Sequence, residues 1–411
     1  MIELQGKHGI AKVFTDNIES TATSQVIELL NQEIFIGSKV RIMPDCHAGK
    51  GCVIGFTADL GDKIIPNLIG VDIGCGMLCI ELGNVEVDLK QLDDIIHRFV
   101  PSGHNIHEQR VFDFTEQINT LHCIREISDH GWNARKWTRQ IGSLGGGNHF
   151  IELNVDDLNN KYLVIHSGSR HLGKSVADYY QNLAIDLCSG KSDYFNEKDR
   201  LIEDYKKQGK KDQIQKALKT LKTKYDKLLP SIPRDLCYLT GKYRDMYLHD
   251  MQIAQEFAVK SREVMVDIII SNLGLAVLQE EMFHTIHNYI DFNDNIIRKG
   301  SIKADKGLKV LIPMNMRDGS LLCIGKGNPD WNNSAPHGAG RLMSRSKAKE
   351  MINMEEYIDT MKDVYSTSIT KSTLDEAPMA YKPMQEIIDN IVDTVDIIAI
   401  LKPIYNFKAS D

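Results

Sequence analysis

The feature that most constrains this chain is the repeated pairing of short apolar runs with glycine-rich turns that carry histidine, cysteine or carboxylate side chains. The clearest case is LIGVDIGCGMLCIEL, in which Asp72 and Cys75 share a turn with three glycines. Short apolar runs bounded by glycine favour buried β-strands. Polar groups at the ends of such strands are held by a rigid scaffold, which suits a functional site. The pattern therefore predicts a sheet-based core with chemistry at its strand ends.

Strands and helices are predicted to alternate along the chain. Strands are expected at residues 39–43, 51–57, 77–81, 149–153 and 162–166. Helices are expected at residues 23–30, 88–99, 176–188, 204–229, 248–271, 347–363 and 384–401. Interleaved elements without a repeat or a low-complexity linker predict one α+β (mixed α/β) domain over residues 1–411. Central sheets surrounded by helices are the expected architecture.

Charge is distributed unevenly along the chain. The net charge is −7, yet residues 205–227 hold nine lysines against Asp212 and Asp226, which makes that stretch +7 and the remainder −14. A helical hairpin inserted at residues 189–235 would contain this stretch. It is either a solvated amphipathic helix pair or a surface that tracks phosphates, and the sequence leaves both readings open.

The sequence shows no membrane-spanning or signal-peptide segment and no paired cysteines, which bears on the expected compartment of the protein. No run of about 18 apolar residues occurs, and the first residues have no signal-peptide core, so we expect a cytoplasmic protein without a membrane partner. The eight cysteines form no CxxC pair, and disulfides are not expected in a reducing compartment. Most of them are expected to be buried apolar residues.

Several of the glycine-rich turns hold side chains that suit metal ions. His149 follows three glycines in SLGGGNHFIE, and His166 ends the apolar run in YLVIHSGSR. In FHTIHNYID, His284 and His287 share a face if the segment is helical and point to opposite sides if it is extended, so only one is expected to be a ligand. The candidate ligands are Asp72, Cys75, His149, His166 and His287. Such a mixed set fits Zn²⁺, Mn²⁺, Fe²⁺ or Co²⁺, and the thiolate by itself favours zinc.

The segment SAPHGAGRLMSR contains a candidate nucleophile. His337 is flanked by glycines and followed by Arg341 and Arg345. A segment of this composition is not expected to lie in a hydrophobic core. An exposed imidazole can attack phosphorus while arginines offset the charge on the phosphate oxygens. A plain surface loop is the alternative that these residues leave open.

Six motifs in order give the chain a family resemblance. RIMPDCHAGKG, GVDIGCGM, LGGGNHFIE, HSGSR, HGAGRLMSR and DEAPMAYK resemble the RtcB family of RNA-splicing ligases from about residue 40 to the C-terminus. The resemblance implies a GTP- and Mn²⁺-dependent ligase that joins RNA 3′-phosphate or 2′,3′-cyclic phosphate ends to 5′-hydroxyl ends. It implies intermediates with GMP on histidine and then an RNA-(3′)pp(5′)G end. Its expected partner is a cleaved tRNA or another structured RNA.

The resemblance also assigns roles to residues of this chain. The implied catalytic residues are His337, Asp45, Asn148 and Arg341. A pair of Mn²⁺ ions bridged by Cys75 is implied on Asp72, Cys75, His149, His166 and His287. The implied GTP-binding residues are Asn148, Glu152, Arg341, Arg345, Tyr381 and Lys408. Arg170 and Lys299 are implied to bind RNA.

Two segments depart from the family pattern and keep other functions open. Within the loop at 311–335, the chain reads IPMNMRDG where a glycine- and serine-containing stretch is expected, and the terminus reads FKASD instead of ending in Lys-Gly. Both segments belong to the nucleotide pocket of the family. One alternative is therefore a metal-dependent phosphoesterase or cyclic phosphodiesterase that acts on RNA ends without ligation. Another is a catalytically silent RNA-binding scaffold.

Overall fold

Two β-sheets form the framework of the protein. The computed structural model describes residues 1–129, 131–225, 229–276 and 282–409. The first sheet has six strands in the order β1-β2-β3-β4-β12-β11. Its strands are β1 (Ile2–Gln5), β2 (Ile10–Val13), β3 (Val40–His47), β4 (Ile54–Asp59), β12 (Ile296–Lys299) and β11 (Asn288–Asp291). Helix α1 (Ser20–Leu30) packs beside its first three strands.

The second sheet has seven strands in the order β10-β6-β8-β7-β17-β15-β14. Its strands are β10 (Met282–Ile286), β6 (Gly76–Gly83), β8 (Lys161–Ser167), β7 (Phe150–Val155), β17 (Val395–Lys408), β15 (Gly319–Gly325) and β14 (Lys309–Asn315). Every residue of β8 is buried, which explains the apolar run at 162–165 in its middle. Two short pairs, β5 (Lys63–Ile64) with β9 (Leu239–Thr240) and β13 (Ser301–Lys303) with β16 (Ser334–Pro336), complete the strands.

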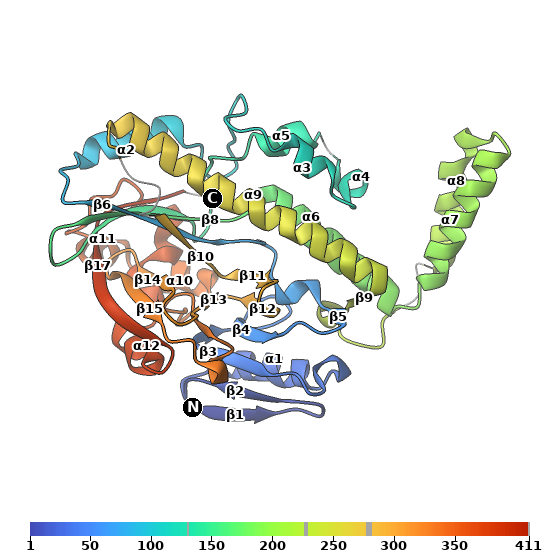
Figure 1. Ribbon diagram of the computed structural model, residues 1–411, viewed down its shortest axis with the longest axis horizontal. Helices are drawn as coiled ribbons and strands as arrows, with labels where there is room; N and C mark the ends of the chain where they lie inside the picture. The colour runs from blue at the N-terminus through green and yellow to red at the C-terminus, as the bar shows by residue number, and fades with distance from the viewer. Residues whose placement is uncertain (130, 226–228, 277–281, 410–411) are drawn as a thin grey trace.

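One long helix spans both sheets. Helix α9 (Gly241–Leu273) runs beside α6 (Arg170–Cys188), as Figure 1 shows. Apolar residues from its first half, such as Phe257, share a core with the six-stranded sheet and α6. Residues near its end, such as Ile269, share a second core with β6, β8 and α2 (Leu89–Phe99). Helix α9 therefore fixes the two sheets relative to each other.

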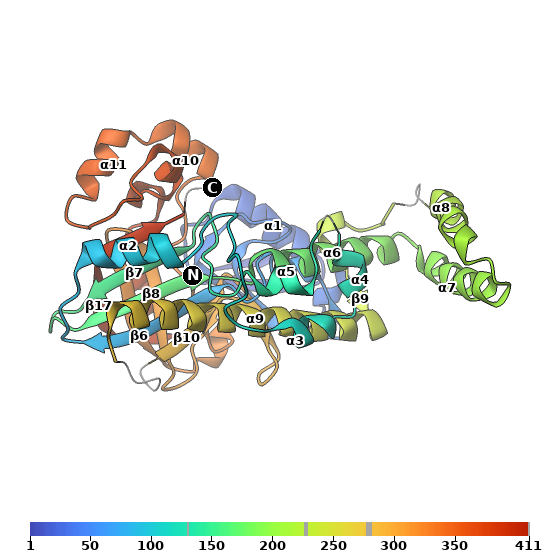
Figure 2. The ribbon, with the colours of Figure 1, turned by 90° about the horizontal axis from the view of Figure 1, so that it is seen from above.

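Shorter helices cover the remaining faces. Helices α3 (Thr115–Asn119), α4 (Ile124–Ile127) and α5 (Ala134–Thr138) lie near α6 and α9. Helix α12 (Met384–Ile391) packs on β14 and β15. Helices α10 (Arg345–Met351) and α11 (Met354–Thr360) enclose a small core of their own, visible as a separate lobe in Figure 2. No helix among the described residues has the length and apolar character needed to cross a membrane.

The lysine-rich stretch lies in a pair of helices that stands apart from the sheets. Helix α7 (Ser192–Lys207) packs against α8 (Ile214–Tyr225), and both figures show the pair projecting beyond the end of α6. One continuous helix over 204–229 was predicted, and this is wrong. Gly209 has a φ of +73°, a conformation that suits glycine and ends α7 before the chain turns into α8. Residues 226–228 of the predicted helix lie outside the described residues.

The five predicted strands are confirmed, as β3, β4, β6, β7 and β8, with shifts of a few residues. The helix predicted at 347–363 is two helices, because Asn353 caps the start of α11 through the backbone N–H of Glu355. The helix predicted at 384–401 is wrong beyond Ile391. Its β-branched residues from Val395 onward form the start of β17, where they pair with β15.

Candidate active site

The register of the seven-stranded sheet brings four predicted ligands to one place. Gly76 at the start of β6 pairs with Ser167 at the end of β8 and with Ile286 at the end of β10. Phe150 at the start of β7 pairs with His166. The residues at or next to these pairs therefore lie together at the same end of the four neighbouring strands β10, β6, β8 and β7. They are Cys75, His149, His166 and His287.

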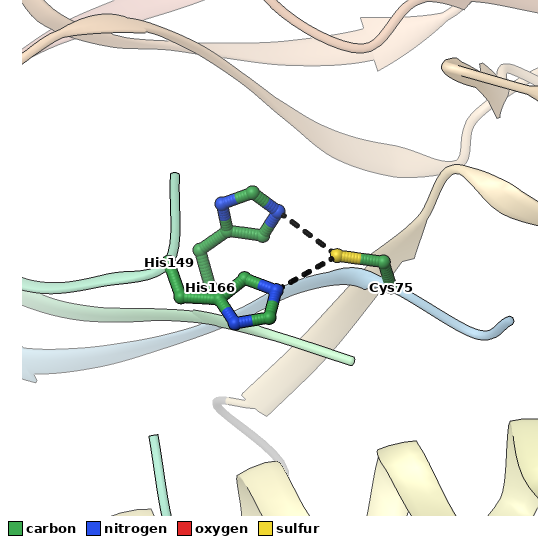
Figure 3. Close-up of side chains that lie close together, drawn as sticks. All are labelled: Cys75, His149 and His166. Carbon is green, nitrogen blue, oxygen red and sulfur yellow. Dashed lines mark hydrogen bonds between the residues drawn. The ribbon is translucent and has the colours of Figure 1, made fainter. Parts of the chain in front are cut away.

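The side chains of this group converge on a small volume. The Cys75 Sγ atom lies 3.3 Å from His166 Nε2 and 3.4 Å from His149 Nε2, as drawn in Figure 3. His166 Nε2 is also 3.4 Å from His287 Nε2. His149 Nε2 lies 3.0 Å from Asp72 Oδ2. All five predicted ligands thus form one cluster, which we call the ligand cluster.

His284 lies away from this cluster. It belongs to β10, and its Nε2 is 3.6 Å from Glu263 Oε1 on α9. His287 follows at the junction of β10 and β11, where its backbone N–H donates to the Cys75 carbonyl at 2.9 Å. The extended alternative for this segment is correct, and the two histidines point to different sides.

The donor set of the ligand cluster fits a divalent cation. The backbone carbonyl of Asn148 accepts from His166 Nδ1 at 3.1 Å, so the lone pair of that ring lies on Nε2, inside the cluster. Burial lowers the pKa of both His166 and His287 well below the usual value, so both rings are neutral. Neutral imidazoles beside a carboxylate and a thiol are metal-ligand chemistry. These residues can therefore hold a metal ion.

The charge of the Asp72 carboxylate affects the pKa of the Cys75 thiol. Burial and the nearby Asp72 charge raise the pKa of the Cys75 thiol. A bound cation reverses this effect, because it stabilises the thiolate that ligates it. Asp72 is held in place by the backbone N–H of Ser169, which donates to its Oδ1 at 3.1 Å. A side chain at Gly168 would clash with the same carboxylate, which explains the glycine there.

His337 is oriented by a buried aspartate. Asp45 Oδ2 accepts from His337 Nδ1 at 2.6 Å and from the His337 backbone N–H at 3.1 Å. Asp45 on β3 is fully buried, whereas the His337 side chain keeps 18% of its surface exposed. With Nδ1 donating, the lone pair of the ring lies on Nε2. The His337 ring is 4.8 Å from the His287 ring, so it adjoins the ligand cluster.

A tight turn brings these two residues together. Gly340 has a φ of +75°, and a β-carbon there would clash with the backbone of Asp45. Only glycine allows the loop after His337 to approach β3 this closely.

A pocket opens beside His337 and the ligand cluster. It contains about 870 Å³ of space, part of which is open to solvent. His166 and His287 belong to both the pocket wall and the ligand cluster. Other predicted site residues in its lining are Asn148, Glu152, His337, Arg341, Arg345, Tyr381 and Lys408. The pocket thus unites the predicted nucleophile, metal ligands and nucleotide-binding residues.

Glu376 organises the cationic side of the pocket, and the sequence analysis missed it. Its carboxylate lies 2.8 Å from Lys408 Nζ, 2.9 Å from Arg345 and 3.2 Å from Arg341. The Tyr381 hydroxyl donates to it at 2.7 Å. Burial would raise the pKa of Glu376, but the charges of Lys408 and Arg345 lower it to about 2. The motif DEAPMAYK, which contains Glu376, was the available signal.

Glu152 is a second carboxylate in the pocket wall. Asn406 Nδ2 donates to Glu152 Oε1 at 2.7 Å, and Asn154 Nδ2 donates to its other oxygen at 3.4 Å. Burial raises the pKa of Glu152 to about 7, against the lowering effects of Asn406 and Lys408. This group can accept or donate a hydrogen bond near neutral pH.

The two predicted RNA-binding residues do not line the pocket. Arg170 begins α6, and its guanidinium donates to the carbonyls of Gly103 at 2.8 Å and Asn105 at 3.2 Å. Lys299 is buried, and its ammonium donates to the carbonyls of Lys50 at 2.6 Å and Cys52 at 3.1 Å. Burial lowers the pKa of both groups, that of Arg170 to about 10. In this structure both cations hold loops near the site.

Comparison with known proteins places this geometry in a class of ligases. Residues 25–409 match the family described as "tRNA-splicing ligase RtcB". The chain is 29% identical over 425 residues to the RNA-splicing ligase RtcB of Escherichia coli K12, covering 95% of each chain. It is 27% identical over 439 residues to the tRNA-splicing ligase RtcB of Nanoarchaeum equitans, covering 84% of this chain and 83% of that relative. The chain belongs to the RtcB family.

Proposed function

We propose that this protein is an RNA ligase that joins a 3′-phosphate or 2′,3′-cyclic phosphate end to a 5′-hydroxyl end, with GTP as the source of activation. The observation that carries the proposal is the pairing of His337 with buried Asp45 beside the ligand cluster. Family membership over residues 25–409 supports the reaction class. The proposed substrates are broken RNAs such as cleaved tRNA.

In the first step, His337 Nε2 attacks the α-phosphorus of GTP. A P–N bond forms, the bond from the α-phosphorus to the bridging oxygen breaks, and pyrophosphate leaves. The imidazole gains positive charge as the bond forms, and the Asp45 carboxylate at 2.6 Å from Nδ1 stabilises it. The product is GMP held on His337 as a phosphoramidate.

The pocket residues have proposed roles toward the nucleotide. Arg341 and Arg345 offset the charge on the phosphates, as guanidinium groups do in phosphoryl-transfer sites. Glu152, Tyr381 and Lys408 contact the guanosine, and Asn148 orients its phosphate. Lys408 and the arginines are engaged by Glu376. Nucleotide phosphates would compete with that carboxylate for the same cations.

The ligand cluster is proposed to hold Mn²⁺ through Asp72, Cys75, His149, His166 and His287. When bound, divalent cations lower the pKa of a hydroxyl or water and offset phosphate charge. His166 and His287 place the cluster at the wall of the pocket that contains His337. Arg170 and Lys299 remain proposed RNA contacts, and each would first have to release the carbonyls that it holds.

Two further steps complete the proposed reaction. An oxygen of the RNA 3′-phosphate attacks the phosphorus of the His337-bound GMP, the P–N bond breaks, and the RNA carries a 3′-diphosphate linkage to guanosine. The 5′-hydroxyl of the second RNA then attacks the RNA 3′-phosphorus. GMP leaves, and a 3′,5′-phosphodiester forms. Activation is needed because a 3′-phosphate has no good leaving group of its own.

The loop at 311–335 supports one competing function. Met314 and Met316 line the pocket in the segment where the family resemblance expects a glycine- and serine-containing stretch. Bulkier side chains there would reduce the space for a nucleotide. The competing proposal is therefore a metal-dependent phosphoesterase that trims RNA ends without GTP.

The test uses α-³²P-labelled GTP, Mn²⁺ and a nicked stem-loop RNA with 3′-phosphate and 5′-hydroxyl ends. Wild-type protein is expected to become labelled and to join the RNA, whereas His337→Ala does neither. His284→Ala is the matched control, because that histidine contacts Glu263 outside the pocket. Trimmed but unjoined RNA without labelling would support the phosphoesterase, and labelling of His337→Ala would refute the nucleophile.

A further inference from the structure

In the α7–α8 helical pair, α7 carries charges of both signs and α8 carries only positive charge. Helix α8, with the sequence IQKALKTLKTKY, has four lysines and no acidic residue. Helix α7, with the sequence SDYFNEKDRLIEDYKK, carries the acidic residues of the pair. A solvated helix pair that served no partner would gain from mixing the two signs along each helix. Helix α8 instead presents one sign of charge.

Three lysines of α8 form an exposed row. Ile214, Leu218, Leu221 and Tyr225 are partly buried on the side of α8 that packs on α7. Lys216, Lys219 and Lys222 are exposed and spaced three residues apart, so they form a stripe that winds around α8, and Lys222 at its end borders a cavity that Asp186 on α6 also lines. We call these three residues the α8 lysine row.

The α8 lysine row lacks acidic partners. Elsewhere in the pair, Lys224 lies 3.2 Å from Glu197 and Lys207 lies 3.8 Å from Glu203. Within the part of the chain that the structure describes, no ion pair is formed by any lysine of the row. Neighbouring like charges without partners repel each other, so an anionic ligand would stabilise the row.

Helix α6 connects the row with the catalytic site. Its first residue, Arg170, follows Ser169, whose N–H holds Asp72. Its last residue, Cys188, leads into α7. Nineteen residues of helix extend for roughly 28 Å, so the helical pair begins about that far from the ligand cluster. Figures 1 and 2 show the pair projecting further outward from there.

We propose that the α8 lysine row is a docking surface for the sugar-phosphate backbone of the RNA substrate, at a distance from the broken ends. This proposal rests on the proposed ligase function and adds where the body of the RNA is held. Lysines arranged along one helix match phosphates that repeat along a strand. Such contacts carry no sequence information, so the row selects RNAs by size and shape.

The distance predicts which RNAs the row affects. At roughly 2.8 Å of helix axis for each base pair of an A-form RNA helix, 28 Å corresponds to roughly ten base pairs. RNAs with at least about 15 base pairs beside the break are expected to reach the row. RNAs with arms of about five nucleotides are not.

The test compares Lys216→Gln/Lys219→Gln/Lys222→Gln with a control of equal charge. Glutamine keeps the helix propensity of lysine closely, so α8 is expected to stay folded. The control, Lys7→Gln/Lys362→Gln/Lys402→Gln, also takes the net charge from −7 to −10, at exposed lysines outside the helical pair. Circular dichroism and thermal melting verify that all variants are folded.

Binding of long and short nicked RNAs is measured from 50 to 300 mM salt, together with ligation. The row variant is expected to lose roughly tenfold or more in affinity for the long RNA, and the slope of log K against log salt to fall by two to three. The row variant is expected to ligate the short RNA at the wild-type rate. The control variant is expected to keep the wild-type RNA affinity, salt slope and ligation rate. Replacing the three lysines by arginine is expected to retain long-RNA binding, because the charge is kept.

Unchanged affinity and salt slope for the long RNA would overturn the proposal, and the row would then be a solvated surface or a site for an acidic protein. An equal loss with the control variant would also overturn it, because net charge alone would explain the effect. Failure of the wild-type protein to ligate the short RNA would count against the proposed function instead. The two failures are thus distinguishable.

Discussion

Asp45→Asn tests how Asp45 prepares His337 for the proposed attack on GTP. The substitution keeps the shape of the side chain and removes its charge. In the wild-type structure, one oxygen of Asp45 accepts from both His337 Nδ1 and the His337 backbone N–H. The other oxygen is buried and has no hydrogen-bond partner among the residues that the structure describes. The asparagine oxygen is therefore expected to face His337, with its NH₂ group on the unpartnered side.

The expected loss follows from the bond that is weakened. A buried hydrogen bond to a charged group contributes about 1.5–3 kcal/mol. Because the imidazole gains positive charge in the transition state, most of this amount is lost from catalysis. At 1.36 kcal/mol for each factor of ten, the guanylation rate should fall by roughly 10- to 150-fold. Binding of GTP should change little, since Asp45 does not line the pocket.

The assay is single-turnover transfer of label from α-³²P-labelled GTP at saturating GTP and Mn²⁺. Asp250→Asn is a suitable control, because Asp250 is also fully buried and accepts two backbone N–H groups, from His122 and Cys123, outside the pocket. A wild-type guanylation rate for Asp45→Asn would refute this account of His337. So would a loss that appears only in GTP affinity.

Two further predictions concern the carboxylate in the pocket and the ligand cluster. The pKa of Glu152 is about 7 in the folded protein and near 4.5 in the unfolded chain. Because the unfolded chain loses the Glu152 proton at the lower pH, the free energy of unfolding falls as the pH rises from 4.5 to about 7. The loss amounts to roughly 3 kcal/mol, and Glu152→Gln should abolish it in urea unfolding at pH 5 and pH 8. An unaltered pH dependence in the variant would contradict the role of burial. Mn²⁺ should raise the melting temperature of the wild-type protein, because a ligand that binds only the folded state stabilises that state. The same Mn²⁺ concentration should raise the melting temperature of Cys75→Ala much less. Equal shifts in the two proteins would show that Cys75 is not a ligand.

Local sequence predicts the parts of this fold that depend on local rules. The strand that ends at His166 was identifiable because an unbroken apolar run met a glycine-rich turn. The segment from Val395 was mistaken for helix because it continued the apolar pattern of the preceding helix. Its pairing with β15 is a long-range contact, which no local pattern contains.

The candidate site shows the same division. The ligand residues are visible as histidine, cysteine and aspartate in unusual turns, but their meeting depends on the register of β10, β6, β8 and β7. The residue pattern alone indicated that only one of His284 and His287 is a ligand, and the family resemblance assigned that role to His287. Glu376 stands in the motif DEAPMAYK, but its role depends on Lys408 and Arg345, which are distant in sequence and become its neighbours only in the fold.

The position of the site between the two sheets has a consequence for the life of the protein. Its groups come from segments as distant as Asp45 on β3 and Lys408 at the end of β17. Contacts between residues so far apart in sequence form late in folding, because long loops must close first. A nascent chain or a fragment that lacks the last strand has the motifs without the assembled pocket. Under the proposed function, reactivity toward nucleotide would therefore report that synthesis and folding are complete, and unfinished chains should not consume GTP.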